Sequence, residues 1–187
     1  MNILYLHGWG SHYDPTNEKI VELSKIGTVS GFTIDYCVDA TVIESLLVKH
    51  VINAKIDLIV GTSLGGFWAA SVGSVTGVPF VSINPALDPS TSLNHYIGNG
   101  ITYSGNEYLL TQDVIDTYKL YDFDLYGCGL ILLDKADKVV DNVATQAKMD
   151  GHYEVEMFEG GSHRFEHMKE SLPLIKYHYG ISQIVYN

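Results

Sequence analysis

Cysteine, arginine and long apolar runs are scarce in this chain of 187 residues. Its two cysteines, Cys37 and Cys128, are far apart and lack metal-ligand spacing, which argues against a disulfide framework or a zinc site. No segment approaches the roughly 20 consecutive apolar residues that a membrane span needs. The first residues show neither the basic region nor the cleavage site of a secretory signal, so we expect a soluble cytoplasmic protein.

Positive charge is also scarce, because Arg164 is the only arginine and the formal net charge is −11. Nucleic acids and anionic membrane surfaces are bound by clustered lysine and arginine. The composition therefore argues against both as partners.

Apolar runs of strand length alternate with segments of helical periodicity along the whole chain. The runs cover 3–6, 32–36, 56–60, 78–83, 130–133 and 153–158, and the helical patterns cover 15–26, 40–54 and 64–75, with a last helix expected within 164–178. This alternation is typical of βαβ units. It predicts an α/β fold with a mostly parallel six-stranded sheet flanked by helices, in a single domain over residues 1–187.

Residues 86–127 interrupt this alternation before the penultimate strand. The segment holds six of the thirteen tyrosines, several glycines and asparagines, and one helical pattern near 107–121. A long irregular insertion in a compact sheet is usually functional or disordered. Its aromatic content favours an ordered cap or lid.

A candidate nucleophile lies in the stretch LIVGTSLGG, residues 58–66. Gly61-x-Ser63-x-Gly65 follows an apolar run and precedes a helical pattern, which is the context of a nucleophile elbow. Ser63 would occupy a strained turn where only small residues fit two positions away. The motif alone is short enough to occur by chance, so it indicates a nucleophile only together with a base and an acid elsewhere in the chain.

A serine nucleophile needs a histidine base and a carboxylate that orients it, and both follow later strands. His163 lies in a Gly-Gly-Ser-His turn after the last predicted strand. Three aspartates are candidates for the acid: Asp134, Asp137 and Asp141. We favour Asp137, because we expect it in the loop, whereas Asp134 lies at the strand end and Asp141 is expected inside the next helix. The order Ser, Asp, His is that of α/β-hydrolases.

The early motif His7-Gly8-Trp9-Gly10 ends the first strand and fits an oxyanion loop. In this architecture the oxyanion is held by the amide after the nucleophile, here Leu64, and by one from an early loop, here Trp9. We assign His7 and Gly8 to substrate binding, together with Phe67. For Phe67 and its neighbour Trp68, core packing of the helix is the competing interpretation.

These motifs together resemble the small bacterial esterases of the YqiA type in the α/β-hydrolase superfamily. The similar stretches, spread in order over nearly the whole chain, are ILYLHGWGS (3–11), GTSLGGFWA (61–69), INPALDP (83–89), YSGNEY (103–108), LLDKADKVVD (132–141) and GGSHRFEHM (160–168). The resemblance implies a compact hydrolase that lacks the first two strands of the larger fold. It places the nucleophile at Ser63, the acid at Asp137 and the base at His163. Asp134 and Ala136 depart from the family pattern around the acid.

We therefore expect a serine hydrolase that cleaves carboxylic esters or acyl thioesters of small molecules through an acyl-enzyme, without a metal or organic cofactor. Two alternatives stay open. One is an amidase or peptidase with the same triad, and the other is a non-catalytic binding protein that keeps the scaffold.

Overall fold

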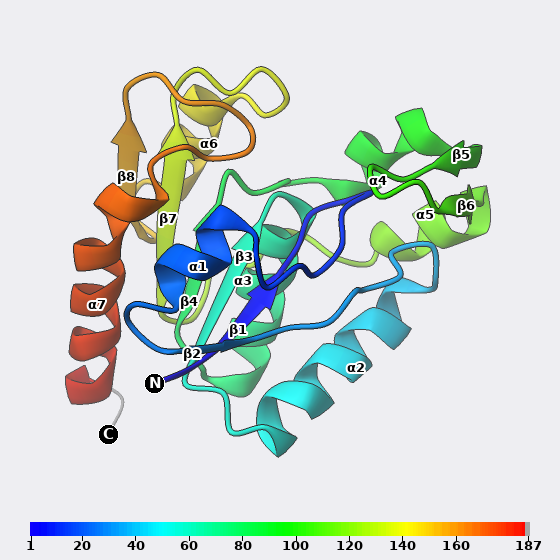
Figure 1. Ribbon diagram of the computed structural model, residues 1–187. Helices are drawn as coiled ribbons and strands as arrows, with labels where there is room; N and C mark the ends of the chain where they lie inside the picture. Colours follow the sequence, from blue (N-terminus) through cyan, green and yellow to red (C-terminus); the bar gives the residue numbers. More distant parts are fainter. Residues whose placement is uncertain (186–187) are drawn as a thin grey trace.

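Six strands form a sheet in which every neighbouring pair is parallel (Figure 1). The computed structural model describes residues 1–185. In sheet order the strands are β2 (Thr28–Ser30), β1 (Asn2–Leu6), β3 (Leu58–Thr62), β4 (Phe80–Ile83), β7 (Gly129–Asp134) and β8 (Glu154–Phe158). The predicted α/β fold with a six-stranded parallel sheet is confirmed.

The order of the strands reverses beside β1. The chain moves outward from β1 to β2, then crosses back to β3 and continues through β4 and β7 to β8. In open α/β sheets, ligands bind beyond the carboxyl ends of the strands at such a reversal. The fold therefore directs attention to the loops that follow β1 and β3.

Helices cover both faces of the sheet and enclose two apolar cores. The helices are α1 (Glu18–Leu23), α2 (Ala40–Asn53), α3 (Leu64–Thr76), α4 (Pro89–Ser92), α5 (Gln112–Tyr118), α6 (Asn142–Met149) and α7 (Met168–Val185), and a 3-10 turn covers Leu93–Tyr96. Side chains of α2, α3 and α5 pack on one face, whereas those of α1 and α7 pack on the other. Because neighbouring strand residues point to opposite faces, Leu4 contributes to one core and Ile3 to the other. No helix within residues 1–185 is long and apolar enough to cross a membrane.

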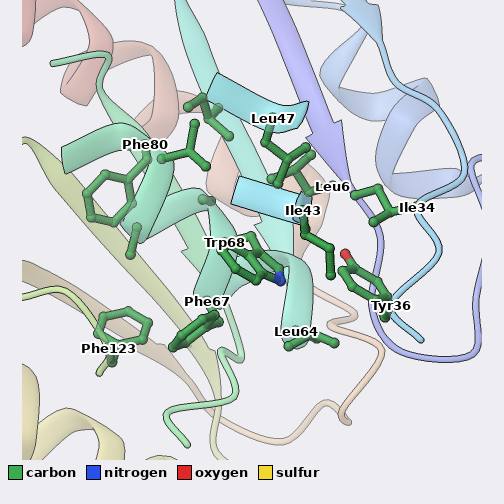
Figure 2. Packing of buried hydrophobic residues seen from close by; sticks show 14 of the residues in the cluster. Leu6, Ile34, Tyr36, Ile43, Leu47, Leu64, Phe67, Trp68, Phe80 and Phe123 are labelled. Atoms are coloured by element: carbon green, nitrogen blue, oxygen red, sulfur yellow. The ribbon is translucent and has the colours of Figure 1, made fainter. Parts of the chain in front are cut away.

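Aromatic side chains fill the core between α2, α3 and the sheet (Figure 2). Phe67 and Trp68 are both fully buried on α3 and meet edge to face, with ring centroids 5.4 Å apart. Figure 2 shows Phe67 beside Phe123, which comes from the 86–127 segment. Full burial of a large apolar side chain contributes roughly 1.5–3 kcal/mol, so these residues tie α3 to its surroundings.

The strand predicted over 32–36 is wrong. The edge strand is β2, at Thr28–Ser30, and residues 32–36 form a loop. Ile34 and Tyr36 are buried, and they face the core from this loop. Both residues bond to His7 and not to a neighbouring strand. The Ile34 amide donates to Nε2 of His7, and the Tyr36 hydroxyl donates to the backbone carbonyl of His7.

Segment 86–127 contains an antiparallel hairpin that the sequence patterns did not indicate. Its strands are β5 (Gly98–Ile101) and β6 (Glu107–Leu110), so within the helical pattern predicted near 107–121 only residues 112–118 are helical, as α5. Figure 1 shows the hairpin with α4 and α5 at the end of the molecule away from α7. The ordered elements agree with an ordered insertion, and its role as a cap stays a prediction.

Two helix boundaries also differ from the predictions. Helix α1 begins at Glu18 with Asn17 as its N-cap, so Pro15 and its neighbours form a turn before the helix. Helix α7 begins at Met168, because residues 159–167 are occupied by a loop that bonds to the ends of other strands. That loop carries His163.

Candidate active site

Ser63 occupies a sharp turn between β3 and α3. Its backbone has φ 57° and ψ −119°, a region that residues with side chains rarely adopt. A Cβ at Gly61 would overlap the carbonyl oxygen of Gly65, and a Cβ at Gly65 would overlap that of Leu6 in β1. The two glycines are therefore required by the close approach of backbone to backbone, and the turn lifts Ser63 from the carboxyl end of the sheet.

The structure brings Ser63, His163 and Asp137 together from three different loops. Nε2 of His163 lies 3.0 Å from Oγ of Ser63, and Nδ1 of the same ring lies 2.7 Å from Oδ2 of Asp137. The His163 side chain is 26% exposed, whereas that of Asp137 is shielded from solvent. Both distances are within hydrogen-bond range, so the imidazole connects the hydroxyl to the carboxylate.

Asp137 is held in its ionised form by hydrogen bonds. Its Oδ1 accepts from the amides of Val139 and Val140, at 2.7 and 3.0 Å. Burial by itself raises the pKa of this carboxyl, but the bonds from His163 and the two amides outweigh it, so the pKa lies below its usual value. A charged carboxylate facing Nδ1 of His163 favours the tautomer that leaves Nε2 free to accept a proton from Ser63.

The two backbone amides predicted as oxyanion donors, those of Trp9 and Leu64, have no hydrogen-bond partner within residues 1–185. Leu64 is the first residue of α3. The loop His7-Gly8-Trp9-Gly10, called the Trp9 loop, lies close to the serine because Gly8 has no side chain: a Cβ on Gly8 would lie 3.2 Å from Cβ of Ser63. The role of the two amides as oxyanion donors stays a prediction.

Asp134 and Asp141, the alternative acids, have other partners. Nδ1 of His167 lies 2.6 Å from Oδ1 of Asp134, so a second His–Asp pair exists beside the first. Asp141 caps the N-terminus of α6 by accepting from the Ala144 amide, so its expected place inside the helix is wrong. His167 was missed by sequence reasoning, although it lies in the same GGSHRFEHM stretch as His163.

The sequence matches the model of a family described as an uncharacterised protein family, UPF0227, over residues 2–179. The chain belongs to the UPF0227 family. Curated relatives include UPF0227 proteins of Vibrio parahaemolyticus and Vibrio atlanticus, which are 29% and 31% identical over 181 residues; each alignment covers 93% of this chain and 97% of the relative. The resemblance to the YqiA type is thereby confirmed.

Solved structures similar to this UPF0227 protein share its fold. Est1E from Butyrivibrio proteoclasticus superposes with a TM-score of 0.72 at 16% identity, covering 98% of this chain and 88% of the other. A monoacylglycerol lipase from Paleococcus ferrophilus superposes with a TM-score of 0.65 at 15% identity, covering 97% and 92%. At such identities the likeness establishes the α/β-hydrolase fold.

The UPF0227 protein has a cavity of about 420 Å³ next to the Trp9 loop. The walls come from residues 9–11, from the loop 33–37 and from the β5–β6 hairpin. The hairpin is fastened to the Trp9 loop by the Tyr103 amide, which donates to the Gly10 carbonyl at 2.9 Å, and the Tyr108 ring meets the Trp9 ring edge to face. Asp35 and Glu107 line the cavity, and its described lining contains no lysine or arginine.

Two residues assigned to substrate binding are placed elsewhere by the structure. Phe67 is fully buried in the core and does not line the cavity. His7 is 2% exposed; Nδ1 bonds to the Gly8 carbonyl at 2.8 Å and Nε2 accepts from the Ile34 amide at 2.8 Å. Burial lowers the pKa of His7, which favours the neutral ring that these two bonds require. His7 thus joins the Trp9 loop to the loop 33–37 instead of facing a ligand.

Metal ligands do not gather in this part of the molecule. Over residues 1–185 no group of three or more His, Cys, Asp or Glu side chains is arranged to hold a metal ion.

Proposed function

We propose that this UPF0227 protein is a serine hydrolase that cleaves carboxylic esters or acyl thioesters. The observation that carries the proposal is the continuous chain from Ser63 through His163 to Asp137, with 3.0 and 2.7 Å between the bonded atoms, at a strained strand-to-helix turn. The fold shared with a monoacylglycerol lipase and an esterase domain from Rhodothermus marinus also supports hydrolysis of an ester bond.

The proposed reaction uses His163 as base and as acid in turn. Oγ of Ser63 attacks the acyl carbon while Nε2 of His163 takes the hydroxyl proton, and the amides of Trp9 and Leu64 stabilise the oxyanion. The C–O or C–S bond then breaks, and the alcohol or thiol leaves with the proton from His163. Nε2 of His163 then deprotonates a water molecule, which attacks the acyl-enzyme. The acyl–Oγ bond breaks, His163 returns the proton to Oγ of Ser63, and the carboxylic acid leaves.

We assign the substrate to the cavity beside Trp9, which is lined by the Trp9 loop and by neither Ser63 nor His163, and this cavity favours a small neutral ester. Its volume of about 420 Å³ fits a small molecule, and aromatic rings form part of its wall. A coenzyme A thioester would bring phosphate groups next to Asp35 and Glu107 in a protein whose formal net charge is −11. Like charges placed together disfavour binding, so we propose short neutral acyl esters over coenzyme A thioesters.

Two measurements test the proposal. The wild-type protein should hydrolyse p-nitrophenyl butyrate and react with a fluorophosphonate probe, whereas Ser63→Ala should lose both activities and keep the wild-type circular dichroism spectrum. Retained turnover in Ser63→Ala would exclude this mechanism. For the substrate class, kcat/KM for p-nitrophenyl butyrate should exceed that for butyryl-coenzyme A, and Glu107→Lys should narrow the difference; a preference for the thioester would contradict the assignment.

A further inference from the structure

A buried carboxylate that belongs to no triad role holds the loop in which His163 lies. Asp134, at the end of β7, is fully buried. Its Oδ2 accepts from the amides of Ser162 and Glu166, at 3.1 and 2.8 Å, and its Oδ1 faces Nδ1 of His167 at 2.6 Å. The three donors lie on both sides of His163 in the chain, so one carboxylate fastens the loop before and after the proposed base.

Asn84 completes this attachment from the neighbouring strand end. Its Nδ2 donates to the carbonyls of Ser162 and His163, at 3.0 and 3.3 Å, and its Oδ1 accepts from the Asp134 amide at 2.9 Å and from Asn142 at 2.8 Å. Asn84 has φ 42°, a conformation that costs free energy for a residue with a side chain. The fully bonded amide offsets that cost and joins the ends of β4 and β7 to the histidine loop.

Two glycines bring the backbone of this loop against the same carboxylate. Gly160 and Gly161 both adopt positive φ, at 77° and 72°, and a Cβ on Gly161 would overlap the Asp134 carboxylate. The loop backbone is therefore packed directly onto this carboxylate. The His167 ring stacks on Phe158, with centroids 4.9 Å apart and planes 7° apart, which orients its Nδ1 toward Asp134.

We propose that Asp134, through its bonds to the 162–167 backbone and to His167, is a positioning residue that keeps His163 in line with Ser63. This inference rests on the proposed function. Asp137 sets the orientation of the imidazole ring, whereas Asp134 sets the position of the backbone that carries it. A displacement of a catalytic group by about 1 Å can reduce the rate of reaction about 100-fold.

The variants separate the hydrogen bond from general packing. Asp134→Asn keeps the shape but replaces one acceptor oxygen with a donor that faces other N–H groups. His167→Phe keeps the ring on Phe158 and removes the N–H donor, whereas His167→Asn keeps a donor near the position of Nδ1 and removes the ring. Glu159→Gln is the control, because it breaks the exposed Lys135–Glu159 ion pair in the same loop and touches none of these bonds.

We expect kcat for p-nitrophenyl butyrate to fall about 100-fold in Asp134→Asn and about tenfold in His167→Phe. KM should stay within twofold of the wild-type value, because the cavity assigned to the substrate is lined by the Trp9 loop and not by residues 159–167. His167→Asn should recover at least a third of the wild-type kcat, and Glu159→Gln should match wild type. Melting temperatures recorded in parallel show which variants are folded; if Asp134→Asn does not fold, the two His167 variants decide.

The proposal is overturned if the folded variants melt at lower temperature but keep kcat within twofold of wild type, or if His167→Asn is as impaired as His167→Phe. A wild-type protein that hydrolyses no ester and does not react with the fluorophosphonate would instead contradict the proposed function. The two failures are therefore distinguishable.

Discussion

Gly8→Ala tests whether the Trp9 loop supplies an oxyanion donor. Gly8 does not adopt the left-handed backbone region, so alanine is compatible with its conformation. The added Cβ would lie 3.2 Å from Cβ of Ser63, 3.3 Å from the Thr62 carbonyl oxygen and 3.7 Å from Oγ of Ser63. The substitution therefore presses the Trp9 loop away from the serine without strain in the residue itself.

The size of this displacement follows from the contact distances. Carbon atoms in favourable contact are about 3.5–4.0 Å apart, so the loop must retreat by roughly 0.3 Å or more. Complete loss of one oxyanion donor costs about 3 kcal/mol of transition-state stabilisation. A partial displacement should cost about half as much, which corresponds to a roughly tenfold lower kcat/KM. The free energy of unfolding should fall by about 1 kcal/mol, because the added Cβ makes two contacts shorter than 3.4 Å and neither is a direct overlap.

Esterase kinetics and urea unfolding measured on the same preparation separate the two effects. Gly180→Ala in α7 is the matched control, since a Cβ added there would meet open space and alanine favours a helix. That variant should keep wild-type kinetics and be no less stable. If Gly8→Ala retained full kcat/KM while the control behaved as expected, the Trp9 amide would not be an oxyanion donor.

Two further predictions concern folding. Gly65→Ala should lower the free energy of unfolding by about 3 kcal/mol or more, because the added Cβ would overlap the Leu6 carbonyl oxygen. Gly77→Ala should lower it by about 1 kcal/mol, because Gly77 has φ 72° but a Cβ there would meet open space. Equal losses for the two variants in urea unfolding would contradict the predicted overlap at Gly65. The pKa of His7 is lowered from 6.5, so the unfolded state binds more protons and the unfolding free energy should fall as pH drops below about 6.5. His7→Gln should reduce this dependence and the exposed control His152→Gln should not; identical pH profiles for wild type and His7→Gln would refute the assignment.

Local sequence patterns were sufficient for the central strands and for α2 and α3. The strands β1, β3, β4 and β7 are buried on both faces, and burial of that kind requires continuous apolar runs that are visible in the sequence. The edge was predicted wrongly because residues 32–36 are apolar for another reason. Ile34 and Tyr36 face the core from a loop, and whether such a run joins the sheet depends on the partners that its backbone finds, here His7.

The candidate triad could be chosen from the sequence because the chemistry requires a particular order of residue types after successive strands. Sequence alone left Asp134, Asp137 and Asp141 as rivals, since all three lie within eight residues of one another. Their partners were decided by the packing of the β8–α7 loop against the ends of β4 and β7, which gives Asp137 to His163 and Asp134 to His167. Hydrogen bonds between loops depend on distances of tenths of an ångström across segments remote in the chain, and only the tertiary structure determines those distances.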